Sequence, residues 1–198
     1  MKKIQFTTLG LVSALLVTSC GSKELTKKEF IENVIKNMAN QVPNFKNGTA
    51  KAKLSDYKFS CSSEENKTFY KEFYEATIYS VLRVFDFKID DNFDFTKGYE
   101  STIELNEKDI KQLIDERPTS YAYEVTLKED TTRFIKNGND LTYITLTSDE
   151  TGNFEASTTI NEYNLMTYKE SKIHYMVEEK DNNIELEYRL TFEYTFKS

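Results

Sequence analysis

The thiol of Cys20 stands in a sequence context that favours covalent lipid attachment. A basic pair, Lys2-Lys3, precedes an apolar run over residues 4–17, and Val17-Thr18-Ser19 leads directly into the cysteine. Basic, apolar and small-residue regions in this order are typical of a secretory signal, and the apolar run is too short for a stable transmembrane helix. We therefore expect residues 1–19 to be a bacterial lipoprotein signal peptide, cleaved so that a diacylated Cys20 becomes the first residue.

Lipidation of Cys20 would make the membrane a partner of the protein. Two acyl chains give stable anchoring where one chain would be marginal. We expect residues 20–24 to be the lipidated cysteine with a short tether, and the protein to be held on the extracytoplasmic face of the cell membrane. Cleavage leaves 179 of the 198 residues. That length suits one hydrophobic core, so we expect residues 25–198 to form a single domain.

Catalytic motifs are otherwise absent from the sequence. The single histidine, His174, lies between Ile173 and Tyr175 on the polar side of an expected strand, which favours an ordinary surface histidine. Cys61 has no disulfide partner once Cys20 is lipidated. The sequence does not exclude a nucleophile–base pair of Cys61 and His174, but no flanking motif supports one. No nucleophile elbow or phosphate-binding glycine loop is present. We expect a protein that is not an enzyme and that uses no cofactor.

An acidic stretch matches the start of a calcium-binding loop. Asp90, Asn92 and Asp94 have the spacing of the first three EF-hand ligands. Phe95 then stands where the sharp turn needs glycine, and Ser101 stands where a glutamate should complete the site. The sequence therefore favours a solvated acidic loop and predicts no metal site.

The net charge argues against nucleic acid as a partner. The formal charge of the chain is −7, and removal of residues 1–19, which carry two lysines and no acid, makes it −9. A phosphate backbone is bound by clustered lysine and arginine, and the sequence has no basic stripe of that kind.

Helices are expected in three segments. Thr26 and Glu29 have the spacing of a capping box, and apolar residues follow at helical spacing up to Pro43, which predicts an amphipathic helix over residues 27–41. Residues 64–80 also fit a helix, with a strand following to residue 89. Asn106 is a suitable N-cap for a short helix over 107–115. The first helix could cover a sheet or form a lid over a ligand cavity.

Strands dominate the rest of the chain. Apolar and polar residues alternate near 50–59, after a turn at Asn47-Gly48, and, after residue 120, in segments around 121–127, 134–135, 143–146, 154–160, 165–168 and 173–177. The clearest alternation runs from Ile184 to Phe196. Short links between successive strands imply antiparallel neighbours. These patterns predict an α+β fold: a curled antiparallel sheet, a half-barrel-like meander, covered by the N-terminal helix and one or two further helices.

The layout resembles that of LolA-like and LppX-like bacterial lipoproteins. The resemblance rests on the lipobox, the Leu25-Thr26-x-x-Glu29-Phe30 helix start, a small-residue strand, and meandering strands such as the segment 134–143. It implies a curved, incomplete barrel closed by helices around an apolar cavity that takes up acyl chains. It carries over no functional residue, because no binding motif matches.

Two functions are left open by the sequence. The first is binding of a lipid or other apolar ligand in a cavity lined by Phe30 and Val34 of the first helix together with Tyr188, Phe192 and Tyr194 of the long strand. The second is a surface interaction protein with a packed core and a protein partner that the sequence does not identify. A cavity would favour the first function, and a solid core with an exposed apolar patch would favour the second.

Overall fold

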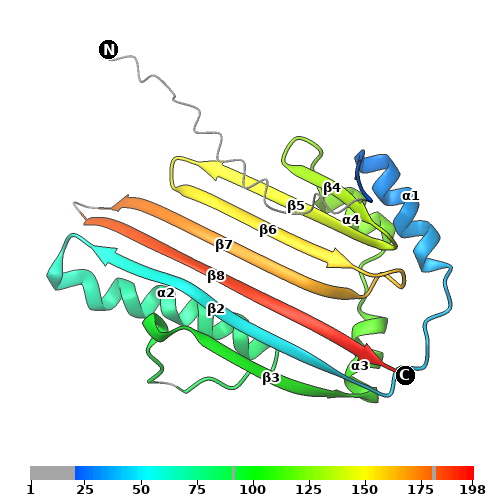
Figure 1. Cartoon of the computed structure of the whole chain (residues 1–198). Coiled ribbons are helices and arrows are strands. Elements are labelled where there is room, and N and C mark those ends of the chain that lie inside the picture. Colours follow the sequence, from blue (N-terminus) through cyan, green and yellow to red (C-terminus); the bar gives the residue numbers. More distant parts are fainter. Residues whose placement is uncertain (1–20, 91, 180–181) are drawn as a thin grey trace, which may run out of the picture.

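A single open sheet of eight antiparallel strands organises the protein (Figure 1). The computed structural model describes residues 21–90, 92–179 and 182–198, so Cys20 and the predicted signal peptide lie outside the described residues. The strand order is β1-β4-β5-β6-β7-β8-β2-β3. The strands are β1 (Ser22–Leu25), β2 (Asn47–Cys61), β3 (Tyr99–Asn106), β4 (Thr132–Asn137), β5 (Asp140–Asp149), β6 (Gly152–Ile160), β7 (Met166–Glu179) and β8 (Asn182–Lys197). The predicted α+β class with a curled antiparallel sheet is confirmed.

Helices cover one face of this sheet, which we call the inner face. They are α1 (Lys27–Met38), α2 (Glu64–Val84), α3 (Glu107–Asp115) and α4 (Ser120–Thr126), with a 3-10 turn η1 (Phe95–Lys97). In the described part of the chain, no helix is long and apolar enough to cross a membrane. The opposite, outer face carries mostly polar side chains.

The predicted helix starts at Thr26 and Asn106 are confirmed. The Thr26 side chain accepts from the backbone N–H of Glu29 while the Glu29 carboxylate accepts from the Thr26 N–H, and Asn106 and Asp109 form the same reciprocal pair. Each box satisfies donors that a helix start leaves without partners. The first helix ends at Met38 rather than at residue 41.

The alternation along β8 is confirmed over its whole length. Its buried apolar residues are Ile184, Leu186, Tyr188, Leu190, Phe192 and Tyr194. Glu193 and Thr195 are exposed on the outer face, while Glu187 is half-buried and lies 2.7 Å from Lys58 Nζ. Directly paired residues share a face, and Tyr143, Thr158, Lys169 and Phe192 lie in one row from β5 to β8. This row identifies the inward-facing residues of each strand.

The predicted strand over residues 81–89 is wrong. Helix α2 continues to Val84, after which Asp86 takes a positive φ of 59° and the chain turns. Ile78 and Leu82 are buried one helical turn apart, and Phe87 is buried after the turn. Apolar residues at 78, 81, 82 and 85 also fit one side of a helix. The pattern after residue 79 is therefore compatible with a helix as well as with a strand.

The predicted strand at 121–127 is also wrong, because this segment forms α4. The Thr119 side chain caps the helix by accepting from the Ala122 N–H, 3.2 Å away. Tyr123 and Leu127 are buried, whereas Tyr121 and Val125 are 72% and 62% exposed. The two residues of each pair are four positions apart in the sequence. That spacing puts them on the same side of a helix and also on the same face of a strand, so the pattern does not separate the two structures.

Two strands were not predicted from the sequence. Residues 22–24, expected as part of a tether, belong to β1, which pairs with β4. Strand β3 pairs with β2 from Asn47 to Leu54. These two strands are the edges of the sheet.

Candidate apolar ligand site

The inner face carries two separate hydrophobic clusters. The smaller contains Phe30 and Val34 of α1, and the ring of Phe30 lies 5.0 Å from Phe134 and 5.8 Å from Tyr123 between centroids. The larger contains Tyr188, Phe192 and Tyr194 of β8. The five residues predicted to line one cavity are therefore divided between two clusters.

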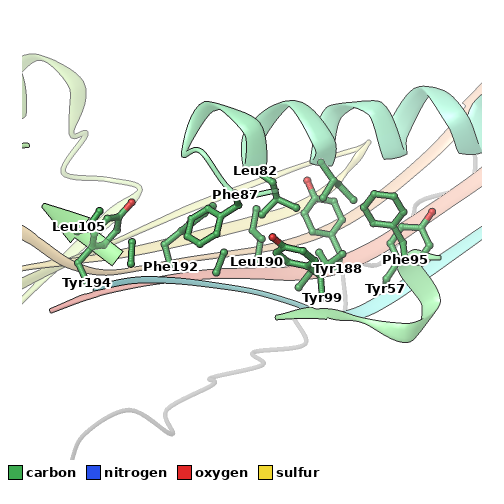
Figure 2. Close-up of a cluster of buried hydrophobic side chains, with 14 of the residues drawn as sticks. Tyr57, Leu82, Phe87, Phe95, Tyr99, Leu105, Tyr188, Leu190, Phe192 and Tyr194 are labelled. Carbon is green, nitrogen blue, oxygen red and sulfur yellow. The ribbon is translucent and has the colours of Figure 1, made fainter. Parts of the chain in front are cut away.

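Most of the predicted residues are packed solidly. Phe30 and Val34 are both fully buried, and Phe192 lies 4.6 Å from Phe85 and 5.9 Å from Phe87 between ring centroids. Figure 2 shows Phe192 and Tyr188 in the layer between α2 and the sheet, with Tyr194 near one end of that layer beside Leu105. Of the five predicted residues, Tyr194 alone lines the two inner-face pockets described next.

The first pocket, which we call the central pocket, lies between the two clusters and has a volume of about 200 Å³. It is bounded by the chain after α3, by α4, by the loop between β6 and β7, and by the inner face of β5 to β8. Its apolar lining comes from Leu113, Tyr123, Tyr143, Ile160, Leu165, Met166, Tyr194 and Phe196. A mostly apolar lining with a few polar groups is the usual composition of a small-molecule site.

Asn164 supplies the most unusual polar group of the central pocket. The residue is 1% exposed and has a φ of 55°, a conformation that asparagine tolerates better than most residues. Its Nδ2 donates to the carbonyl oxygen of Val34 at 2.9 Å. Its Oδ1 is buried and has no hydrogen-bond partner among the described residues. Buried acceptors without a partner are rare in folded proteins, and a water molecule or a ligand can supply the missing donor.

Arg117 supplies positive charge to the same pocket. Its Nε donates to the carbonyl of Ile114 at 2.9 Å, and its Nη1 donates to the carbonyl of Tyr163 at 2.6 Å. These bonds fix the guanidinium between the end of α3 and the β6–β7 loop. Within residues 21–90, 92–179 and 182–198, no carboxylate forms an ion pair with Arg117.

Three tyrosines give the pocket hydroxyl groups that remain protonated. Burial raises the pKa of Tyr194 to about 12, and it also raises the pKa of Tyr123 and Tyr143. Burial disfavours the phenolate because its charge loses water. At neutral pH these side chains are therefore neutral groups that can donate or accept a hydrogen bond.

The second pocket, the helix pocket, lies between the C-terminal end of α2 and α3 and measures about 420 Å³. Ala50, Ile103 and Leu105 line it from β2 and β3. It shares Leu113, Glu116 and Tyr194 with the central pocket, so these three side chains stand between the two spaces. Its remaining charged lining is acidic: Asp86, Glu104 and Asp109.

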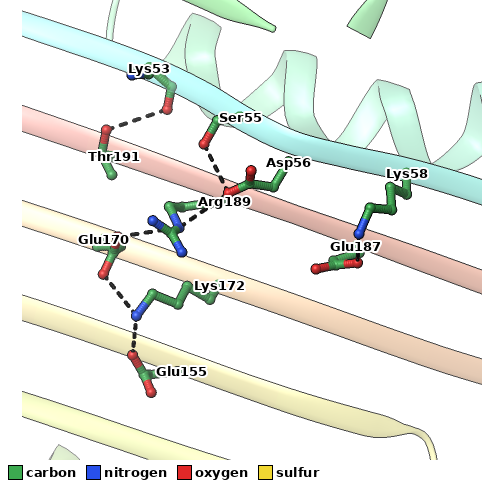
Figure 3. Close-up of polar contacts among 10 residues, drawn as sticks. All are labelled: Lys53, Ser55, Asp56, Lys58, Glu155, Glu170, Lys172, Glu187, Arg189 and Thr191. Carbon is green, nitrogen blue, oxygen red and sulfur yellow. Dashed lines mark hydrogen bonds and ion pairs between the residues drawn. The ribbon is translucent and has the colours of Figure 1, made fainter. Parts of the chain in front are cut away.

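The outer face carries a chain of alternating charges instead (Figure 3). Arg189 Nε lies 3.4 Å from Asp56 and 3.6 Å from Glu170, and Lys172 Nζ lies 3.3 Å from Glu170 and 2.7 Å from Glu155. Glu170 is 7% exposed, and its two cationic neighbours compensate its burial. Each of the two cations lies between two carboxylates, and the five groups carry a formal net charge of −1.

The Cys61–His174 pair left open by the sequence is excluded by the fold. Cys61 is buried and pairs in register with the inward-facing Ile184, whereas His174 pairs with Glu187 on the outer face. His174 Nε2 lies 3.3 Å from Glu185 Oε1. The sheet itself separates the thiol from the imidazole.

The acidic loop uses its carboxylates locally. Asp90 Oδ1 accepts from the Asn92 N–H at 3.0 Å, and Asp94 Oδ1 accepts from the Thr96 N–H at 3.1 Å, where it caps η1. No group of three or more potential metal-ligating side chains occurs in the part of the chain that the structure describes. The EF-hand-like spacing is explained by these turn and cap contacts.

Comparison of the chain with known protein families, with curated proteins and with solved structures gives no match. The resemblance to LolA-like and LppX-like lipoproteins therefore stays a prediction.

Proposed function

We propose that this protein is a non-enzymatic bacterial lipoprotein, anchored through Cys20 on the extracytoplasmic face of the cell membrane, that binds a lipid or other apolar ligand on its inner face. The central pocket carries the proposal. It interrupts the hydrophobic core between two packed clusters and contains a buried acceptor, Asn164 Oδ1, that no described residue satisfies. A core that only had to be stable would fill this space and satisfy that atom.

The helix pocket supports the same function. Its volume of about 420 Å³ falls within the range of roughly 300–1,000 Å³ that ligand pockets occupy. Leu113, Glu116 and Tyr194 line both pockets, so movement of these side chains would join the two spaces into one path.

Binding of a fluorescent fatty acid to the delipidated protein tests the proposal. We expect saturable binding, and we expect Leu113→Trp to abolish it, because the larger side chain would fill the space that both pockets share. Leu113 is half-buried, so the folded state should tolerate the change. Val34 was predicted to line the cavity, but it lines neither pocket, so a larger side chain at this position would not block ligand binding.

Ile35→Trp is the matched control, because Ile35 is 53% exposed on α1 and lines neither pocket. It should bind the probe like the wild type, and the melting temperatures of both variants should verify folding. Linear uptake without saturation, or equal binding by Leu113→Trp and the wild type, would contradict the proposal.

A protein-binding surface is the second candidate function, favoured by the exposed side of α2. Phe69 and Phe73 are 66% and 59% exposed and lie one helical turn apart. Large apolar side chains gathered on a surface mark interaction sites. If this surface is the functional one, Phe69→Ser with Phe73→Ser should abolish partner binding and leave fatty-acid binding unchanged.

A further inference from the structure

We infer that the ligand of the central pocket is a single-chain lipid whose polar end carries an anionic group next to a free hydroxyl. The hydroxyl would donate to Asn164 Oδ1, the anionic group would lie at Arg117, and the acyl chain would extend into the helix pocket. This inference rests on the proposed function and specifies its ligand.

Asn164 determines that the ligand carries a donor. Its amide nitrogen is already engaged with the Val34 carbonyl, so the group of this pocket-lining residue that is left without a partner is the acceptor Oδ1. An ionised carboxylate or a phosphate diester has acceptors only and cannot satisfy Oδ1. A hydroxyl can donate this hydrogen bond.

Arg117 determines that the ligand carries an anion. Two of its five N–H groups are used by backbone carbonyls, which leaves three donors and the full positive charge without a carboxylate among the described residues. A guanidinium held in place in this way suits the paired oxygens of a phosphate or carboxylate.

Lys169 adds a positive charge to the inner face, on the strand next to the pocket-lining Thr158. It faces inward, paired in register between Thr158 and Phe192, and Thr158 lines the central pocket. The residue is half-buried, and its ammonium group has no hydrogen bond or ion pair with any residue of the described ranges. A lysine on the inner face of a sheet requires a reason, because outward positions would leave it hydrated. An anionic ligand group nearby supplies one.

The acidic lining of the helix pocket fixes the direction in which the ligand binds. Asp86, Glu104 and Asp109 would repel an anionic group there, whereas Ala50, Ile103 and Leu105 offer an apolar surface. The head is therefore favoured beside Arg117 and the tail in the helix pocket. Leu113 and Tyr194 would lie along the first part of the chain.

Three probes with the same palmitoyl chain test the inference. They are 1-palmitoyl-lysophosphatidate, with a phosphate and a hydroxyl, palmitate, with an anion alone, and 1-monopalmitoylglycerol, with hydroxyls alone. Each displaces the fluorescent fatty acid from the delipidated wild-type protein, at concentrations below micelle formation. We expect lysophosphatidate to bind at least tenfold more tightly than either of the other two.

Variants assign the two polar contacts. Asn164→Gly, which tolerates the positive φ, should weaken lysophosphatidate about tenfold and leave palmitate unchanged. Arg117→Gln should weaken the binding of lysophosphatidate and of palmitate alike and leave the binding of monopalmitoylglycerol unchanged. Arg117→Lys should restore part of the lost affinity, because lysine returns the positive charge but not the paired donors of the planar guanidinium. Arg133→Gln, an exposed arginine paired with Glu24 at 3.2 Å, should change none of the affinities.

The outcomes separate the inference from the function on which it rests. Saturable binding of all three probes with equal affinity, insensitive to Asn164 and Arg117, would overturn the inference and leave lipid binding in place. Tighter binding of monopalmitoylglycerol than of lysophosphatidate would overturn the anionic head. Absence of saturable binding for every probe would overturn both.

Discussion

At the residue scale, the start of α1 contains a carboxylate whose ionisation contributes to folding. Glu29 accepts from the backbone N–H of Thr26 at 2.8 Å and from Lys23 Nζ at 2.9 Å. These hydrogen bonds, the backbone one first, lower the pKa of Glu29 to about 2. Because the folded-state pKa lies below that of the unfolded chain, the stabilisation is complete above pH 4.5 and is lost as the pH falls towards 2.

Glu29→Gln should remove this dependence on pH. We expect the variant to melt at a lower temperature than the wild type at neutral pH, because the charged acceptor at the helix start is lost. The difference should shrink as the pH falls from 4.5 towards 2. Glu32→Gln, an exposed position in the same helix, provides the comparison, and a difference between Glu29→Gln and the wild type that did not change with pH would contradict the assignment.

The polar residues of the site could not be predicted at this scale. Tyr194 was predicted because it belongs to the alternation of β8, which specifies the direction of each side chain. Asn164 and Arg117 lie in connecting segments, where no period relates a position to a face. Arg117 is held by the carbonyls of Ile114 and Tyr163, and Asn164 by the carbonyl of Val34. Residues 34 and 164 are far apart in the sequence, so no local pattern indicates their contact.

At the scale of elements, β8 gives the sharpest test of the fold. Leu190 is 4% exposed in the larger cluster, whereas Glu193 is exposed on the outer face. Leu190→Asp would bury a charge without a partner and should lower the free energy of unfolding by about 4 kcal/mol or more. Glu193→Gln should change it by less than about 0.5 kcal/mol. Urea unfolding of both variants measures the difference, and similar losses would show that the two positions do not face opposite sides.

The long strand β8, which has one clear period, was predicted correctly, and so was the short helix α3, whose N-cap marks its start, whereas α4 and β1 were not. The alternation of β8 extends over most of its 16 residues and admits only a strand. Helix α4 has only seven residues, and its buried Tyr123 and the buried C-cap Leu127 fit either period. The edge strand β1 has four residues, too few for any period to appear. Tertiary contacts therefore decide these elements: Tyr123 packs on Phe30, and β1 pairs with β4.

At the scale of the whole molecule, the expected lipid anchor and the sheet are nearly contiguous. Gly21 is the only residue between Cys20 and the start of β1 at Ser22. Two residues of extended chain span at most about 7 Å. The expected short tether over 20–24 is therefore reduced further, and an anchored domain would stay close to the lipid headgroups with its β1 edge nearest the anchor.

Replacement of Cys20 tests the anchor itself. In a bacterial host the wild-type protein should fractionate with membranes, require detergent for release and incorporate labelled palmitate, because only the cysteine sulfur can carry the thioether-linked lipid. Cys20→Ser should lose all three properties. Cys61→Ser is the matched control, since that thiol is 8% exposed in the sheet and should have no part in lipidation. Continued palmitate labelling and detergent dependence in Cys20→Ser would refute the lipoprotein assignment. Loss of both properties in Cys20→Ser but not in Cys61→Ser would place the lipid on Cys20.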